Sequence, residues 1–319
     1  MILCGSISGD ETYGIRLIDK ELTGECSGAG LSCSSFLADA GDYIVSSVEK
    51  ACIDGVSGGG AASYRRSDLS CTGLVRGLGR GICHISYSEA KHEVYAASYT
   101  DGTVDVLLLD QSGGLQRKKR ITGPECINAH CTYPLKDGSM LYVCYLGSDC
   151  ITVYDTVDYF PVKKIAFPKG TGPRHMLFSD DEKIIYVSCE LSNMIYSVSA
   201  SDGTVLDSFD ASPGDGSFCA LSSVRYGNDG KSIILGSRGK DGFWVFESDE
   251  SGLIRNPLFT ATGEGFLWDV CSLENGSYLA AFFNADFIEK GRAVNGMWIP
   301  EKRKNIKKPT CFLNYNRNS

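Results

Sequence analysis

Residues 172–179, with the sequence GPRHMLFS, are closely followed by a second apolar segment at residues 183–193, KIIYVSCELSN. The first segment opens with a Gly-Pro turn that carries Arg174 and His175, and the second strand-like run ends on a carboxylate, Glu190. Short apolar runs bounded by Gly, Pro, Asp and Asn are typical of β-strands joined by tight turns. This order of turn and strand recurs along the chain, and the recurrence predicts the fold.

Six copies of the turn and apolar strand can be aligned on one central strand residue. Successive copies are 51, 47, 44, 48 and 45 residues apart. In most copies a second alternating segment follows, as at residues 103–109, 150–154, 194–198 and 242–246. A period in the forties built from strands and turns is typical of β-propeller blades and not of helical repeats. The aligned residues are Ile44, Tyr95, Tyr142, Tyr186, Ile234 and Leu279.

A seventh repeat can be assembled from the two ends of the chain. Residues 13–18 resemble the outer strands of the other copies, and residues 310–315 can supply a partner strand. Pairing both ends in one blade closes the ring and removes exposed sheet edges. The sequence therefore predicts an all-β, seven-bladed propeller of four-stranded antiparallel blades, in a single domain over residues 1–319.

Two segments fit the repeat poorly. Residues 55–81, which include three consecutive glycines, are interpreted as a Gly-rich surface loop, because no strand and helix flank them as in a phosphate-binding loop. Residues 286–308 carry several Lys and Arg, which is typical of a solvated face, and make the last blade look irregular.

The composition restricts the partners and the compartment. A formal net charge of −8 argues against general binding to nucleic acid or anionic membranes. The first residues lack the basic and long apolar regions of a secretory signal, and no stretch approaches the roughly 18 apolar residues of a membrane span. The 14 cysteines are scattered and include no C-x-x-C pair, so we expect reduced thiols, no zinc site and a cytoplasmic location.

Polar residues concentrate at two positions of the repeat where packing of the interior alone would favour apolar or small side chains. Three of the four histidines occupy the first position, which predicts a catalytic or anion-binding site. A polar lining that hydrogen-bonds around a water-filled channel is the alternative, and a metal site is disfavoured because two arginines would oppose a cation. Eleven or twelve residues before the aligned residue stand His84, His130, Arg174, His175 and Trp268, and four residues after it stand Tyr99, Leu146, Glu190, Arg238 and Phe283.

These motifs resemble, in order, those of the seven-bladed lactonase family, which contains bacterial 6-phosphogluconolactonases and fungal carboxymuconate lactonising enzymes. By this resemblance, the active-site residues of the family fall on His130, Arg174, Glu190 and Arg238. The chain departs from the family by having Asn128 where a histidine is frequent, and residues 222–224, SSV, where another histidine is expected. The resembling motifs are residues 82–86, 128–130, 172–175, 190–193 and 237–239.

The resemblance implies hydrolysis of a sugar lactone, most simply 6-phosphogluconolactone in the pentose phosphate pathway. His130 would be the general base, and Glu190 would orient it or share the proton transfer. Arg174 and Arg238 would hold the phosphate of a small anionic substrate or polarise its carbonyl.

His84 and His175 are further candidates for substrate binding, and neither a metal nor a cofactor is expected. A cycloisomerase acting on a muconate-type carboxylate, or a propeller that binds a ligand or protein without catalysis, remains an alternative.

Overall fold

The computed structural model describes residues 1–7, 14–24, 27–31, 33–263 and 265–315. Strands form nearly all the regular structure of these residues, and the two helices are single 3₁₀ turns, η1 (Leu146–Ser148) and η2 (Glu274–Gly276). Within the same residues, no helix has the length and apolar character needed to cross a membrane.

The internal contacts divide the chain into two compact units. One unit comprises Met1–Asp19, Gly24–Lys164 and Thr310–Ser319, and the other comprises Lys20–Thr23 and Ile165–Pro309. A single domain over residues 1–319 stays a prediction.

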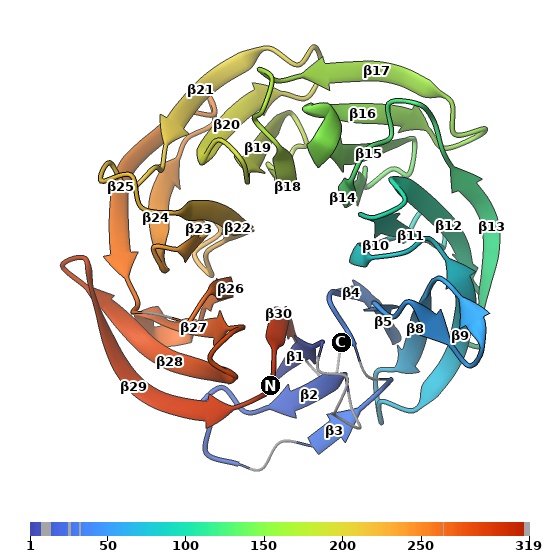
Figure 1. Ribbon diagram of the computed structural model, residues 1–319, viewed down its shortest axis with the longest axis horizontal. Helices are drawn as coiled ribbons and strands as arrows, with labels where there is room; N and C mark the ends of the chain where they lie inside the picture. Colours follow the sequence, from blue (N-terminus) through green and yellow to red (C-terminus); the bar gives the residue numbers. More distant parts are fainter. Residues whose placement is uncertain (8–13, 25–26, 32, 264, 316–319) are drawn as a thin grey trace. The chain divides into compact units, whose positions relative to one another are not determined.

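The first unit contains four four-stranded sheets, which we call blades (Figure 1). In one blade the C-terminal strand β30 pairs with β1, in the order β30-β1-β2-β3, which confirms that the two ends share a blade. Tyr13 of the expected N-terminal strand lies outside the described residues. The strands of this blade are β30 (Pro309–Asn314), β1 (Ile2–Ser6), β2 (Ile15–Ile18) and β3 (Ser27–Ala29).

The other three blades of this unit each place their strands in chain order from one edge to the other. The first of them consists of β4 (Leu37–Ala40), β5 (Tyr43–Val48), β8 (Gly59–Arg65) and β9 (Cys71–Leu78), with a small hairpin of β6 (Cys52–Ile53) and β7 (Val56–Ser57) inserted. The next consists of β10 (Ile82–Ser88), β11 (Glu93–Ser98), β12 (Thr103–Leu109) and β13 (Leu115–Ile121). The last consists of β14 (Ala129–Pro134), β15 (Met140–Tyr145), β16 (Cys150–Asp155) and β17 (Pro161–Ala166).

The second unit contains three blades. A single parallel residue pair, Ala261 with Met297, joins the outer strands of two of them into one eight-stranded sheet, but each keeps its own four-stranded pattern. The described chain thus has the seven blades that the sequence predicts. The strands are β18 (Pro173–Phe178), β19 (Ile184–Cys189), β20 (Met194–Ser199), β21 (Val205–Asp210), β22 (Cys219–Tyr226), β23 (Ser232–Gly239), β24 (Gly242–Ser248), β25 (Ile254–Ala261), β26 (Leu267–Ser272), β27 (Ser277–Phe282), β28 (Phe287–Val294) and β29 (Met297–Asn305).

The interpretation of residues 55–81 as a loop is wrong. Most of this segment forms β8 and β9, the two outer strands of a regular blade. Its glycines fit where backbones come close, since a Cβ on Gly60 would lie 2.6 Å from the Val75 carbonyl oxygen. Glycine weakens a strand in general, but it is tolerated where another backbone approaches this closely.

The expectation of an irregular last blade is also wrong. Residues 286–308 form the regular hairpin of β28 and β29, which completes the β26–β29 blade. Strand β29 is largely exposed, so its lysines and arginines lie on a solvated face as predicted.

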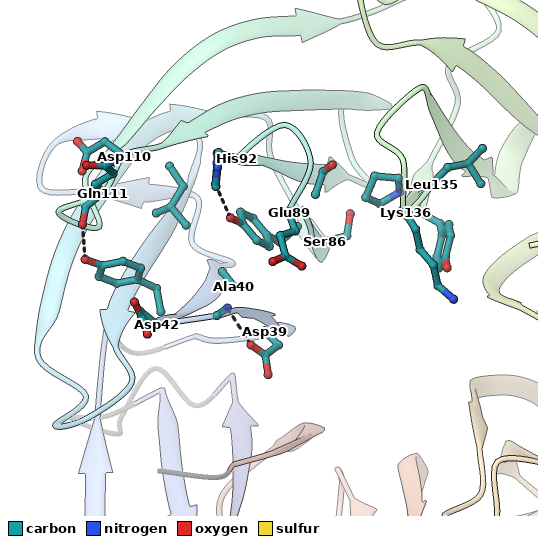
Figure 2. Close-up of a pocket in the computed structure, with 17 residues that line it drawn as sticks. Asp39, Ala40, Asp42, Ser86, Glu89, His92, Asp110, Gln111, Leu135 and Lys136 are labelled. Carbon is teal, nitrogen blue, oxygen red and sulfur yellow. Dashed lines mark hydrogen bonds between the residues drawn. The ribbon is translucent and has the colours of Figure 1, made fainter. Parts of the chain in front are cut away.

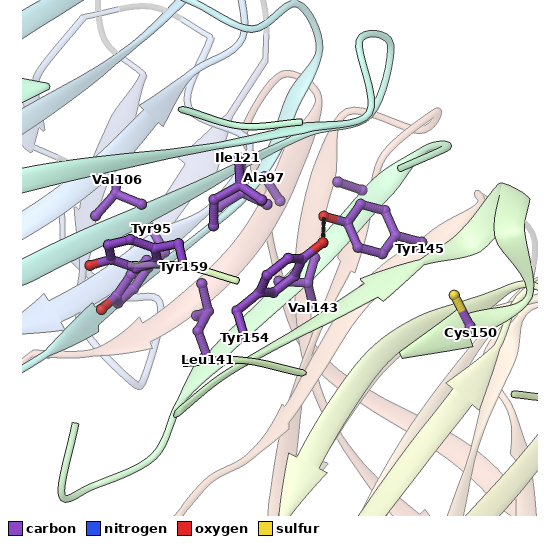
Figure 3. Packing of buried hydrophobic residues seen from close by; sticks show 12 residues of the cluster. Tyr95, Ala97, Val106, Ile121, Leu141, Val143, Tyr145, Cys150, Tyr154 and Tyr159 are labelled. Atoms are coloured by element: carbon purple, nitrogen blue, oxygen red, sulfur yellow. Dashed lines mark hydrogen bonds between the residues drawn. The ribbon is translucent and has the colours of Figure 1, made fainter. Parts of the chain in front are cut away.

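The hydrophobic core lies between neighbouring blades within each unit. Figure 3 shows the cluster between the β10–β13 and β14–β17 blades, where Tyr95 and Val106 of one blade pack with Leu141 and Tyr145 of the other. The hydroxyls of Tyr145 and Tyr154 are 2.9 Å apart and hydrogen-bonded, so buried tyrosines there keep a polar partner. Corresponding clusters join the β18–β21 and β22–β25 blades, and the β22–β25 and β26–β29 blades.

Candidate active site

The first strand of five blades carries a β-bulge close to its N-terminal end. The strand pairing slips by one residue at Cys83 of β10, His130 of β14, Arg174 of β18 and Trp268 of β26, and irregularly at Ser222 and Ser223 of β22. A bulge removes a residue from the ladder and redirects its side chain, and bulges are frequent beside active sites. A bulge thus takes three of the residues selected from the sequence, His130, Arg174 and Trp268, out of the ladder.

Arg174 and Arg238 meet at one carboxylate. Glu190, directly after β19, accepts a hydrogen bond from Arg174 Nε at 2.8 Å and lies 2.7 Å from Arg238 Nη2, both through Oε2. Both arginines are at least 94% buried, whereas the Glu190 side chain is 24% exposed. The three side chains form an ion cluster with one more positive than negative charge.

The charge state of Glu190 follows from its neighbours. Burial raises the pKa of its carboxyl, but the charges and hydrogen bonds of Arg174 and Arg238 outweigh burial and hold the pKa below its ordinary value. Glu190 is thus ionised near neutral pH and is a poor proton donor there.

Three successive carbonyls beside the β22 bulge accept hydrogen bonds from the two arginines. Arg238 donates to the Ala220 oxygen at 3.3 Å and to the Leu221 oxygen at 3.1 Å, and Arg174 donates to the Ser222 oxygen at 2.8 Å. The serines that replace an expected histidine thus lie at a bulge whose backbone carbonyls face the guanidinium groups. His175, 9% exposed, contacts Arg174 Nη1 through its ring nitrogens at 3.2 and 3.3 Å.

Aromatic rings of the last blade flank the arginines. The Trp268 ring centroid is 5.4 Å from Arg238 Cζ and 6.0 Å from Arg174 Cζ, and Phe266 is 5.5 Å from Arg238 Cζ. Phe283 stacks on Trp268 with ring centroids 4.5 Å apart. Aromatic faces attract cations within about 6 Å, so these rings help to hold the guanidinium groups in place.

Sequence reasoning missed Asp241, which positions the aromatic segment. Its buried carboxylate accepts backbone N–H bonds from Gly239 at 3.0 Å, Gly265 at 2.7 Å and Leu267 at 2.9 Å, and a further one from Phe266. In the sequence, Lys-Asp-Gly at this point looks like an ordinary turn, and no repeat signal marks it. Only the approach of the β25–β26 connection reveals its role.

The two remaining histidine candidates belong to the first unit. His130 is 6% exposed and meets Tyr99 edge-on, with ring centroids 5.9 Å apart. Asn128, the departure from the family motif, has a positive φ of 56° and donates its side-chain N–H to the Tyr99 carbonyl at 3.0 Å. Asn is one of the few non-glycine residues that adopt such a φ readily, so it fixes the turn before His130.

His84 lies against two neighbouring blades. Its ring is 4.1 Å from the Phe36 ring, its Nε2 is 3.5 Å from the Cys131 thiol, and its Nδ1 accepts the Thr132 N–H at 3.3 Å. These contacts make His84 part of the packing between blades in addition to a candidate for substrate binding.

The structure therefore brings together Arg174, Glu190, Arg238 and His175 in the second unit. It places His84 and His130 in the first unit, and their participation in the same site stays a prediction. Across the described residues, no group of three or more His, Cys, Asp or Glu side chains is arranged to hold a metal ion. The 13 cysteines that the structure describes are free thiols.

Comparison with known proteins relates the chain to lactonases. A 6-phosphogluconolactonase of Bacillus subtilis is 27% identical over 311 residues, covering 87% of this chain and 88% of the relative. An uncharacterized protein of Lactococcus lactis is 27% identical over 219 residues, and the chain spans 62% of that relative's length.

A solved structure supports the fold. The periplasmic gluconolactonase of Pseudomonas aeruginosa superimposes with a TM-score of 0.83 at 21% identity, covering 99% of each chain. A family model described as lactonase, 7-bladed beta-propeller, matches residues 4–281. The chain therefore belongs to the lactonase family of seven-bladed β-propellers.

Proposed function

We propose that the protein hydrolyses a sugar lactone, with 6-phosphogluconolactone as its substrate. The observation that carries this proposal is the ion cluster of Arg174, Glu190 and Arg238, which keeps an excess positive charge beside the bulge at Arg174. A chain with a net charge of −8 needs such a local positive site to bind an anionic substrate. The B. subtilis relative named 6-phosphogluconolactonase, matched over most of both chains, supports the same substrate.

In the proposed reaction, water attacks the lactone carbonyl carbon while His130 takes its proton. The bond from that carbon to the ring oxygen then breaks, and the ring oxygen takes up a proton from His130 as it becomes a hydroxyl. The product is an open-chain acid, which releases one proton to solution at neutral pH. This scheme uses no metal ion.

The arginines stabilise negative charge in this scheme. Their planar donor groups suit the oxyanion that forms on the carbonyl oxygen and the oxygens of a phosphate. The lowered pKa of Glu190 argues against a share in proton transfer, which leaves the other predicted role, the orientation of His130. His175 would act through its contact with Arg174.

The test is acid release from 6-phosphogluconolactone above the spontaneous rate, followed by pH-stat titration. The wild-type protein is expected to accelerate release, and His130→Ala to lower kcat by about 10²–10⁴-fold, as for loss of a general base. Unphosphorylated gluconolactone, run in parallel, reports whether the phosphate contributes to kcat/KM.

His92→Ala is the matched control, because His92 is exposed and lies after β10, at the other end of that strand from His84. No acceleration of either lactone by the wild type would contradict the proposed function. Equal rates for the wild type and His130→Ala would remove His130 from the mechanism.

A further inference from the structure

The two ends of the proposed substrate need different partners. The lactone carbonyl at C1 needs hydrogen-bond donors for the oxyanion, whereas the phosphate at C6 also needs positive charge, because a phosphate ester carries close to two negative charges at neutral pH. The ion cluster of Arg174, Glu190 and Arg238 has an excess of only one positive charge. A second cationic group is therefore expected near it.

A cavity of about 970 Å³ in the first unit does not provide this group (Figure 2). It is lined by residues 86–89 and 133–136, at the C-terminal ends of β10 and β14, whereas His84 and His130 lie near the N-terminal ends of these strands. Four carboxylates outnumber one ammonium group in its wall, so the wall repels anions. The charged residues of the wall are Asp39, Asp42, Glu89, Asp110 and Lys136.

Lys308 occupies the repeat position directly before the first strand of a blade. Gly172 precedes β18, Phe266 precedes β26 and Lys308 precedes β30, and all three have a left-handed backbone, with φ of 65°, 65° and 44°. The Lys308 backbone N–H donates to the Asp286 carboxylate at 3.0 Å, and the Ile306 N–H donates to the Asp286 carbonyl at 3.1 Å. Lys308 is thus fixed against the turn that follows β27.

The Lys308 ammonium contacts the aromatic residues that flank the arginines. Its Nζ lies over the Phe283 ring, 4.9 Å from the centroid. Phe283 stacks on Trp268 at 4.5 Å, and the Trp268 ring is 5.4 Å from Arg238 Cζ. Two aromatic rings therefore connect Lys308 with the arginine cluster, and all these residues belong to the second unit.

The charge of Lys308 is not neutralised within the described part of the chain. Its Nζ is 3.5 Å from the uncharged Asn284 Oδ1, in a solvent-exposed contact, and forms no ion pair with the residues that the structure describes. Other basic residues of the same blade do pair with carboxylates. They are Lys290, Arg292 and Arg303.

This arrangement suits a phosphorylated sugar. Binding sites for small molecules combine apolar and aromatic walls with a few polar groups that fix orientation. Here the rings of Trp268 and Phe283 offer apolar surface to the C–H groups of a sugar ring. The cations at Lys308 and at the arginines offer donors for the groups at its two ends.

On the basis of the proposed function, we propose that Lys308 binds the phosphate of the substrate and gives the protein a preference for a phosphorylated lactone. The ammonium donates hydrogen bonds to the phosphate oxygens, and the sugar ring packs against Trp268 and Phe283. Arg174 and Arg238 are then left for the lactone carbonyl.

The test is the phosphate preference, which is the ratio of kcat/KM for 6-phosphogluconolactone to kcat/KM for gluconolactone. The wild type is expected to prefer the phosphorylated lactone. Lys308→Gln is expected to lower the ratio by about 10–100-fold, as for loss of a hydrogen bond to a charged group. Lys308→Arg is expected to keep most of it, because a guanidinium group also binds phosphate.

Lys302→Gln is the matched control, because Lys302 is an exposed lysine of the same blade and the change in net charge is the same. Its phosphate preference is expected to equal that of the wild type. Thermal melts check that each variant is folded.

Titration calorimetry with 6-phosphogluconate and with gluconate measures binding without catalysis. The wild type is expected to bind 6-phosphogluconate more tightly than gluconate, and Lys308→Gln is expected to lose most of this difference. If the wild type hydrolysed neither lactone, the proposed function would fail, and the calorimetry would still decide the role of Lys308.

An unchanged phosphate preference in Lys308→Gln would overturn the proposed role of Lys308 while leaving lactone hydrolysis intact. An equal fall in Lys302→Gln would also overturn it, because the preference would then follow net charge alone. A wild type that failed to distinguish the two lactones, or the two acids in calorimetry, would have no phosphate subsite.

Discussion

At the scale of single residues, Glu190 links the electrostatics of the candidate site to the stability of the fold. Its carboxylate is bonded to both Arg174 and Arg238. Removing one partner of a buried ion cluster leaves the others uncompensated, which costs more than the cluster itself contributes. Glu190 therefore stabilises the folded state and holds both guanidinium groups in place.

Replacing Glu190 with Gln is expected to lower the free energy of unfolding at pH 7, by on the order of 2–3 kcal/mol given its partial exposure. The pKa of Glu190 is lowered in the folded protein, so its contribution is present above the ordinary carboxyl pKa and is lost as the pH falls through the folded-state pKa. The difference between wild type and Glu190→Gln is therefore expected to shrink on acidification. Urea unfolding at pH 7, 5 and 3 measures it.

Glu250→Gln provides the comparison, because Glu250 is an exposed carboxylate of the same unit. Its effect on unfolding is expected to be small at every pH. If the difference in unfolding free energy between wild type and Glu190→Gln stayed constant down to pH 3, the stability of the cluster would not depend on ionised Glu190.

At the scale of elements, bulges and turns determine which side chains leave the blade ladders. The bulges in β14, β18 and β26 take His130, Arg174 and Trp268 out of strand pairing. Turns contribute in another way, since some must pass very close to a neighbouring blade. Gly102, in the turn between β11 and β12, is the clearest example.

Gly102→Ala is expected to destabilise the protein far more than Gly41→Ala. Both glycines have a left-handed backbone, with φ of 67° and 68°. A Cβ on Gly102 would lie 1.7 Å from the Cys126 carbonyl oxygen, whereas a Cβ on Gly41 meets no atom within 4 Å. Gly41→Ala is expected to cost about 1–2 kcal/mol from backbone strain alone, and Gly102→Ala about 1–3 kcal/mol more from the clash.

Thermal and urea unfolding of the two variants measure this difference. Because the backbone conformations match, the additional loss of unfolding free energy in Gly102→Ala reports on the contact between the β11–β12 turn and the segment before β14. Equal losses for Gly41→Ala and Gly102→Ala would mean that this close approach is absent in solution.

At the scale of the whole molecule, the terminal blade joins the two ends of the chain. Strand β30 supplies the buried side chains of Cys311 and Phe312, and the next residue, Tyr315, is buried too. The strand covers the edge of β1, where Ile2 and Leu3 are fully buried. The Tyr315 N–H donates to the Met1 carbonyl at 3.1 Å, so the chain ends of this blade are adjacent.

Deleting residues 309–319 is expected to abolish the folded monomer, because it leaves an unpaired apolar edge that promotes association. A circular permutant that joins Ser319 to Met1 through a short Gly-Ser linker, with new ends between Gly214 and Asp215, is expected to fold. Gly214 is exposed, and a Cβ there would meet no atom within 4 Å, which suits a new chain end.

Size-exclusion chromatography and thermal unfolding compare the two forms. The permutant is expected to elute as the wild type does, and the deletion to elute as aggregate. A deletion variant that melted at the wild-type temperature would show that β30 is dispensable for the fold.

The sequence by itself determined the repeat. The spacing of apolar runs and turns gave the seven blades and the shared terminal blade, because strand formation and turn formation depend on local residue types. The same repeat register selected Arg174, Glu190 and Arg238 as neighbours, since equivalent positions of adjacent blades lie side by side. The interpretations of residues 55–81 as a loop and of the last blade as irregular are wrong. Runs of glycine or of charge do not reveal which strands a segment pairs with.

Only the tertiary structure decided which atoms meet. Three features of the candidate site have no signature in the sequence. They are the bulges that redirect His130 and Arg174, the backbone carbonyls of residues 220–222 that accept the guanidinium donors, and the Asp241 carboxylate that accepts four backbone N–H groups. The cavity beside Glu89 is likewise formed by turns far apart in the chain. Such features depend on pairing register and on distances between blades, which local residue preferences do not specify.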